Sequence, residues 1–258
     1  MKNIARKIYW LVSIQFGIDL RRMLRSVRGI PRYIASWLAF RKRYDGRLVF
    51  FPCLYDWFEE GGSTKDEYFW QDLHVAKKIH QAAPGKHVDI GSRIDGFVAH
   101  VASFREIEIF DIRPVTSVIP GVVFRQADLM SPSDEFVDYC DSLSCLHALE
   151  HFGLGRYGDP IDPYGFVAGL RNMARILRPD GVFYLSVPIG MERVEFNAHR
   201  VFDPLKLASL AGENRLSVSE FSWIGEERQL ITSVAPLDDM ARLKELPYAL
   251  GIFTFVKQ

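Results

Sequence analysis

Short runs of apolar residues recur from about residue 86 onward, and helical or turn-like segments separate them. The runs lie at residues 87–91, 106–112, 122–128, 141–146 and 182–188. Their near-continuous apolar character is typical of strands that are covered on both faces. Strands that alternate with helices predict a mostly parallel α/β sheet with right-handed crossovers. Two further strands are expected at residues 216–224 and 250–257, which makes seven.

The clearest helix is expected at residues 162–177. Its apolar positions fall on one face: Phe166, Val167, Leu170, Met173, Ala174 and Leu177. The sequence Pro179-Asp180-Gly181 is expected to stop this helix. Another helix is expected after Asp203, which would serve as its cap, with Pro204 in the first position.

The first 47 residues differ from the remainder in charge. They contain 12 Lys and Arg against 2 Asp and Glu, a net charge of +10, although the whole chain is formally neutral. Trp10, Phe16, Leu20, Leu24 and Trp37 lie among these basic residues, a pattern typical of an amphipathic helix on anionic lipid. A basic helix packed on the domain or on a partner chain remains the alternative. A nucleic-acid partner is not expected, because no recognisable binding module accompanies the charge.

Three regions are therefore expected: a basic amphipathic extension at residues 1–47, a connector or lid at 48–84, and an α/β domain at 85–258. The apolar run from Ile8 to Ile18 has eleven residues, whereas a membrane-spanning helix needs about 20. No cleavage site follows the run, so a signal peptide is not expected. Three scattered cysteines, Cys53, Cys140 and Cys145, indicate a reducing compartment. We expect a cytoplasmic protein whose extension contacts the inner face of the membrane.

Acidic and small residues follow the first three predicted strands. Open α/β sheets bind ligands beyond the carboxyl ends of their strands. Gly91 after the first strand allows close backbone approach, and Asp111 at the end of the second can accept both hydroxyls of a ribose. Asp128 and Leu129 after the third strand could flank an adenine. Together these residues predict a nucleoside site.

With these residues, the chain resembles the class I S-adenosylmethionine-dependent methyltransferases over roughly residues 86–258. The resemblance rests on "HVDIGS", "IFDIRP", "FRQADL", "SLSCLHALEHF" and "ILRPDGVFYLSVP". More narrowly, "SLSCLHALEHFGLGRYGDPIDP" and "FNAHRVF" are similar to a largely uncharacterised methyltransferase-like family associated with surface-polysaccharide synthesis. The resemblance implies a Rossmann-like, doubly wound, mostly parallel seven-stranded sheet and S-adenosylmethionine as the cofactor.

The resemblance also implies roles for individual residues. The residues implied to contact the cofactor are Asp89, Gly91 and Ser92 at its methionine part, Asp111 at its ribose, Asp128 and Leu129 at its adenine, and Ser144 and Cys145 facing the transferred methyl group. One departure concerns the first loop, where the superfamily usually has Gly-x-Gly-x-Gly. This chain has Gly91, then Arg93, and no further glycine until Gly96. Arg93 could pair with the methionine carboxylate or obstruct the pocket.

The pentad "HALEH", residues 147–151, fits two interpretations. As H-x-x-E-H it matches a zinc-binding helix, which requires both histidines on one helix face and Glu150 as general base. The glycines at 153–158 leave room for about one helical turn, and no third ligand can be named, so this interpretation is not favoured. In the methyltransferase interpretation, His151 with Glu150 is the candidate general base for an acceptor hydroxyl, and His199 is the second candidate.

Polar residues near the pentad are expected to bind the acceptor, a sugar or a lipid-linked glycan. They are His147, Arg156, Tyr157, Asp159, Asn197 and Arg200. Two alternatives stay open. A methyltransferase fold with an altered first loop could serve as a binding or scaffold protein, or His147, His151 and His199 could support metal-dependent chemistry.

Overall fold

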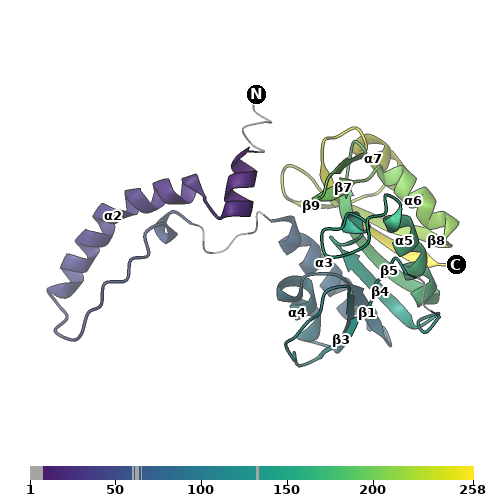
Figure 1. Cartoon of the computed structure of the whole chain (residues 1–258), viewed down its shortest axis with the longest axis horizontal. Coiled ribbons are helices and arrows are strands. Elements are labelled where there is room, and N and C mark those ends of the chain that lie inside the picture. The colour runs from purple at the N-terminus through teal and green to yellow at the C-terminus, as the bar shows by residue number, and fades with distance from the viewer. Residues whose placement is uncertain (1–7, 60, 62–63, 65, 132–133) are drawn as a thin grey trace. The chain divides into compact units, whose positions relative to one another are not determined.

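The chain divides into two compact units, residues 1–63 and 64–258. The computed structural model describes residues 8–59, 61, 64, 66–131 and 134–258. Figure 1 shows the elements of each unit. The boundary between the units falls inside the predicted connector, residues 48–84. The helix that follows the boundary, at residues 67–82, belongs to the second unit.

A long helix, α2 (Leu20–Arg41), dominates the first unit. A π-helical turn, η1 (Leu11–Gln15), precedes it, and a 3-10 turn, η2 (Asp56–Phe58), follows. Asp19 caps α2, because its carboxylate accepts hydrogen bonds from the backbone N–H groups of Arg21 and Arg22 at 2.9 and 3.1 Å. Among the described residues, no helix has the length and apolar character needed to cross a membrane.

Residues 48–58 run back along α2 in Figure 1, without regular structure up to Leu54 and with η2 at their end, and we call this segment the strap. The Phe50 ring packs edge-on against Tyr33 and Trp37, with ring centroids 5.1 and 5.4 Å apart. Gly29 is the buried residue of α2, because the backbone of Leu54 passes directly over it. The strap therefore occupies one face of the helix.

Gly29→Ala should loosen the strap, because the added methyl group would overlap the Leu54 carbonyl oxygen. Overpacking of this kind costs about 1 to 3 kcal/mol. We expect faster hydrogen–deuterium exchange at residues 50–58. Gly212→Ala is the matched control, since it adds the same methyl group to a helical glycine with open space around it. Equal exchange in the two variants would contradict this packing.

The second unit is built on one sheet. Among the described residues, eight strands form it in the order β3-β2-β1-β4-β5-β10-β8-β9. Their bounds are β1 His87–Ile90, β2 Ile107–Asp111, β3 Val122–Gln126, β4 Cys140–Leu146, β5 Leu177–Ile189, β8 Leu216–Ile224, β9 Leu230–Thr232 and β10 Ala249–Lys257. The seven predicted strands are all present. The predicted number of strands was one too low, because β9, a three-residue strand that pairs with β8, was not predicted.

The strand order places a switch point beside β1. Strands β1 to β5 pair in parallel, whereas β10 runs antiparallel between β5 and β8. From β1 the chain adds β2 and β3 on one side and then returns to place β4 on the other. The loops after β1 and β4 therefore diverge, which opens a crevice at their carboxyl ends.

Helices cover both faces of the sheet, as the doubly wound prediction requires. Apolar residues of α5 (Gly165–Ile176), α6 (Pro204–Glu213) and α7 (Pro236–Leu243) join one buried cluster. Those of α3 (Glu67–Ala82), η3 (Ile94–Val98) and α4 (Ala99–Ala102) join a second. Strands β6 (Arg193–Glu195) and β7 (His199–Val201) form a separate two-stranded hairpin, and Phe202 directly after β7 bridges to Ile189 at the end of β5.

The residues Pro179-Asp180-Gly181, which were predicted to stop the helix, lie within a strand. Helix α5 ends at Ile176, and β5 begins at Leu177, five residues before the predicted strand. Cys140 of β4 pairs with Leu177, but Ser142 pairs with Val182, so the intervening residues bulge out of the strand. Pro179-Asp180-Gly181 therefore forms this bulge, and Asp180 has a φ of +61° within it.

Candidate active site

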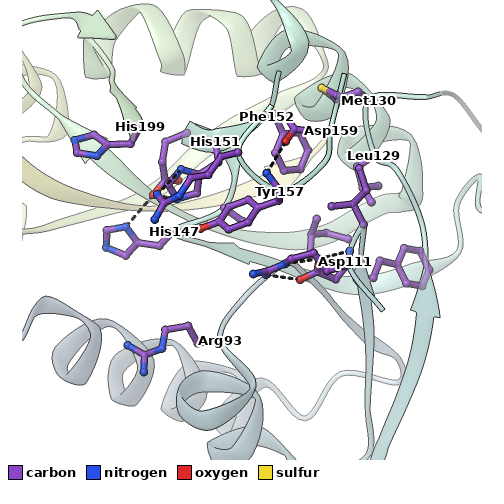
Figure 2. Close-up of a pocket in the computed structure, with 18 of the residues that line it drawn as sticks. Arg93, Asp111, Leu129, Met130, His147, His151, Phe152, Tyr157, Asp159 and His199 are labelled. Atoms are coloured by element: carbon purple, nitrogen blue, oxygen red, sulfur yellow. Dashed lines mark hydrogen bonds and ion pairs between the residues drawn. The ribbon is translucent and has the colours of Figure 1, made fainter. Parts of the chain in front are cut away.

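A cavity of about 330 Å³ lies at the carboxyl ends of β1 to β4 in the second unit (Figure 2). Eleven residues predicted to form the site line it: Gly91, Asp111, Asp128, Leu129, His147, Glu150, His151, Arg156, Tyr157, Asp159 and His199. Figure 2 shows the three histidines on one side of the cavity and Asp111 and Leu129 on the other. The cavity thus joins the predicted nucleoside residues to the predicted acceptor residues.

A buried carboxylate shapes the first loop. Asp89 is fully buried and accepts hydrogen bonds from the Ser92 backbone N–H (3.0 Å), the Ser92 hydroxyl (2.6 Å) and the Ser144 hydroxyl (2.5 Å). Burial raises the pKa of Asp89 to about 6. Gly91 adopts a φ of +68°, which favours glycine. Asp89 and Ser92 therefore fix the shape of the loop. The described residues that line the cavity do not include either of them.

Arg93 lines the cavity on the side of this loop. Its guanidinium pairs with Asp95 at 2.9 Å, lies 5.1 Å from the centre of the Tyr68 ring, and points away from Asp111 in Figure 2. Where the usual pattern has a glycine, this loop thus carries Arg93, and its side chain points away from the end of the cavity where Asp111 lies.

Asp111 ends β2, and its carboxylate already has a partner. The Arg113 guanidinium donates to both carboxylate oxygens at 3.1 and 2.8 Å, and the Arg113 backbone N–H adds a third bond at 2.8 Å. The same guanidinium lies 4.3 Å from the centre of the Tyr157 ring. Arg113 was not among the predicted site residues, although its place two residues after Asp111 in "IFDIRP" was a signal for it.

The segment after β3 supplies an apolar wall. Leu129 is buried, and Phe110 from β2 lines the cavity beside it. The Asp128 carboxylate accepts bonds from the Met130 backbone N–H (2.9 Å) and the Ser131 hydroxyl (3.2 Å). Asp128 therefore fixes the shape of its own loop, and Leu129 presents the apolar surface.

The pentad at residues 147–151 does not form a zinc-binding helix. Strand β4 ends at Leu146, His147 has a φ of +53°, and η4 (Leu149–His151) is a single 3-10 turn. Among the described residues, no group of three or more His, Cys, Asp or Glu side chains is arranged to hold a metal ion.

His147 and Glu150 form a buried pair on the cavity wall. His147 Nδ1 lies 2.9 Å from Glu150 Oε1, and His147 Nε2 lies 3.4 Å from Glu67 Oε1. The Tyr68 ring packs over the imidazole, with centroids 4.5 Å apart, and the Tyr248 hydroxyl donates to Glu67. Glu67 and Tyr68 begin α3, inside the predicted connector, so the sequence pattern did not mark them as site residues.

Each member of this pair favours the charged form of the other. Burial alone would lower the pKa of His147, but the hydrogen bond and charge of Glu150 outweigh it and raise that pKa. Burial likewise raises the pKa of Glu150, but the bond and charge of His147 lower it overall. Among the described residues, Glu150 Oε2 has no hydrogen-bond partner, and His147 Nε2 has only the longer 3.4 Å contact with Glu67. One buried acceptor is therefore left without a partner, and one buried donor is only loosely held.

The other two histidines are neutral proton acceptors near pH 7. Burial lowers the pKa of His151 and of His199 below the usual 6.5. His151 Nε2 lies 3.8 Å from Glu150 Oε1, and its Nδ1 lies 3.5 Å from the Arg156 guanidinium. Groups whose environments separate their pKa values in this way suit distinct acid and base roles.

The other predicted acceptor residues and Cys145 differ in where they lie relative to the cavity. Arg200 is buried and donates to the carbonyl oxygens of Glu150, Phe152 and Pro163, so it holds the turn that carries Glu150. Cys145 is fully buried on β4. The described residues that line the cavity do not include Arg200, Cys145 or Asn197. Asp159, by contrast, lines it and fixes its own loop through the N–H groups of Gly155 and Tyr157.

Comparisons with known proteins agree with this fold. Residues 121–241 match a family model described as a Caenorhabditis protein of unknown function, DUF268. A search of curated proteins gave no match. A Burkholderia thailandensis 1,6-didemethyltoxoflavin-N1-methyltransferase matches with a TM-score of 0.51 at 14% identity, covering 79% of this chain and 81% of its own. The Bradyrhizobium japonicum N-methyltransferase NodS gives 0.51 at 14% identity, covering 78% and 91%.

The fold is that of the class I methyltransferases. The [4+2]-cyclase SpnF matches similarly, with a TM-score of 0.50 at 13% identity over 71% of this chain and 80% of its own. A shared fold therefore leaves the reaction to be argued from the site.

Glu150→Gln should lower the pKa of His147, because it removes the anion that outweighs burial. We expect an NMR titration of the imidazole to show this decrease in pKa. Glu220→Gln is the matched control, because Glu220 lies 3.7 Å from His74 and should affect that histidine alone. An unchanged His147 titration in Glu150→Gln would disprove the charged pair.

Proposed function

We propose that this protein is an S-adenosylmethionine-dependent methyltransferase that methylates an oxygen atom of a sugar or a lipid-linked glycan. The observation that carries the proposal is one continuous cavity with two chemically different ends. At one end are Gly91, Asp111 and Leu129, which suit a nucleoside. At the other are the His147–Glu150 pair, in which Glu150 Oε2 has no hydrogen-bond partner among the described residues, and two neutral imidazoles.

The residues at the nucleoside end fit the cofactor. Asp111 would accept the ribose hydroxyls, and Leu129 with Phe110 would contact the adenine ring. A carboxylate offers about four lone-pair positions, so Asp111 can bind a hydroxyl while it keeps part of its contact with Arg113. When bound, S-adenosylmethionine supplies an electrophilic methyl group on a positively charged sulfur.

The residues at the other end fit a hydroxyl-bearing acceptor. A buried carboxylate oxygen without a partner costs about 1 to 3 kcal/mol, and more when the group is charged. An acceptor O–H bound to Glu150 Oε2 would remove this cost. His147 Nε2, which has only the 3.4 Å contact with Glu67, can donate to a neighbouring oxygen. A neutral His151 can then take the proton that the hydroxyl must lose. His199 is the second candidate for this proton.

The resemblance of "SLSCLHALEHFGLGRYGDPIDP" to a family associated with surface-polysaccharide synthesis supports a glycan as the acceptor. A second candidate function is a binding protein of the same fold that does not use this cofactor. The pairing of Arg113 with both oxygens of Asp111 favours that alternative. Direct measurement of cofactor binding distinguishes the two.

Isothermal titration calorimetry with S-adenosylhomocysteine should detect binding to the full chain. Asp111→Asn should weaken it at least about tenfold, because a hydrogen bond to a charged group contributes about 1.5 to 3 kcal/mol. Asp134→Asn is the control, because Asp134 is an exposed acid paired with Arg175 outside the cavity. Absence of binding by the unaltered chain at millimolar ligand would exclude the methyltransferase proposal.

The rate of methyl transfer should depend on neutral His151. Because its pKa is lowered, the active neutral form persists below pH 6.5, and kcat/KM should decline only at more acidic pH. His151→Gln should lower kcat by about 10²- to 10⁴-fold and abolish that acidic limb. The assay is transfer of radiolabelled methyl from S-adenosylmethionine to a panel of nucleotide sugars and polyprenyl-phosphate-linked sugars.

His199→Gln serves as the comparison in the same assay. If His151→Gln retains the unaltered rate and pH profile while His199→Gln loses both, His199 is the base and the assignment to His151 is wrong.

A further inference from the structure

Helix α2 of the first unit carries an exposed apolar row. The side chains in the row are between 42% and 63% exposed, although all are large and apolar. They are Leu20, Met23, Leu24, Val27, Ile30, Ile34 and Leu38. Spacings of three and four residues place them on one face of the helix. An apolar face of this length marks an interaction surface.

A row of arginines lies beside the apolar row. Arg21, Arg25 and Arg28 each follow a member of the apolar row directly in the sequence, and Arg32 continues their spacing. Successive residues are about 100° apart around a helix, so the basic row flanks the apolar one along its length. The helix contains six arginines and no Asp or Glu. Its exposed charge is therefore of a single sign.

The strap occupies a further face. Gly29, Tyr33 and Trp37 contact its backbone or its Phe50 ring. The Arg22 guanidinium lies 4.0 Å from the centre of the strap's Tyr55 ring, and that of Arg32 lies over Trp57. The strap thus braces α2 from within its own unit while the apolar and basic rows stay exposed.

We propose that the first unit docks on an anionic phospholipid bilayer, with the apolar row at the acyl boundary and the arginine row at the lipid phosphates. Charge complementarity selects this occupant. An apolar face with Arg beside it matches a surface that is apolar inside and negatively charged at its rim. Pairing of two copies through the apolar row would bring two basic rows together, which is electrostatically unfavourable.

This inference is independent of the proposed function, because its residues belong to the unit without the cavity. Membrane docking can therefore succeed or fail whether or not the second unit transfers methyl groups. If both hold, the bilayer would concentrate the enzyme beside lipid-linked acceptors.

Flotation with vesicles tests the proposal on the full chain. We expect stronger binding to vesicles of equal parts phosphatidylcholine and phosphatidylglycerol than to phosphatidylcholine alone. The triple variant Arg21→Gln, Arg25→Gln, Arg28→Gln should weaken binding to the anionic vesicles by about a hundredfold, or roughly fivefold for each arginine. The control triple Lys77→Gln, Arg171→Gln, Arg228→Gln removes the same charge from the second unit and should bind like the unaltered chain.

The apolar row is tested by a second matched pair. Leu24→Ser with Val27→Ser should weaken anionic-vesicle binding at least about tenfold. Val234→Ser with Leu237→Ser makes the same exchange at exposed positions of the second unit and should have no effect. Equal binding to both vesicle types, or unaltered binding by the Leu24/Val27 variant, would overturn the proposal. So would a dimer of the full chain in light scattering that the Leu24/Val27 variant converts to monomer.

Discussion

The buried carboxylate of Asp89 is the interaction on which the cavity depends. It bonds the loop after β1 through Ser92 and the neighbouring strand through Ser144. The Ser92 hydroxyl also accepts the backbone N–H of Leu146, the last residue of β4. These bonds fix the two strands on either side of the switch point just where their loops diverge. The opening between the loops is therefore set by a satisfied polar network, which is more rigid than apolar contact alone.

The acceptor end depends on parts of the chain that are distant in sequence. Glu150 is placed by a single turn after β4, and Arg200 from β7 holds the carbonyl groups of that turn. Glu67 from α3 approaches His147 from another side, and Tyr248 fixes Glu67 in turn. The raised pKa of His147 is thus a property of several elements together.

This arrangement explains which features the sequence could predict. The seven main strands were recoverable because strands covered on both faces read as continuous apolar runs, and Asp203-Pro204 did cap a helix. Strand β9 has three partly or fully exposed residues and leaves no such run. Asp111 and Leu129 were recoverable because strand ends meet at one edge. Glu67 was not, because only tertiary packing brings a residue of a supposed connector to the cavity.

The contact between Arg113 and Asp111 bears on whether a nucleoside can bind. Asp111 is mostly buried, with 14% of its side chain accessible, whereas Arg113 is about half exposed at 48%. The three bonds from Arg113 use about three of the four lone-pair positions of the carboxylate. A ribose with two hydroxyls therefore requires the guanidinium to give up at least one bond. The solvent access of Arg113 permits this shift, because water can take over the released N–H group while the guanidinium stays against Tyr157. Arg113 thus screens Asp111 without closing the cavity.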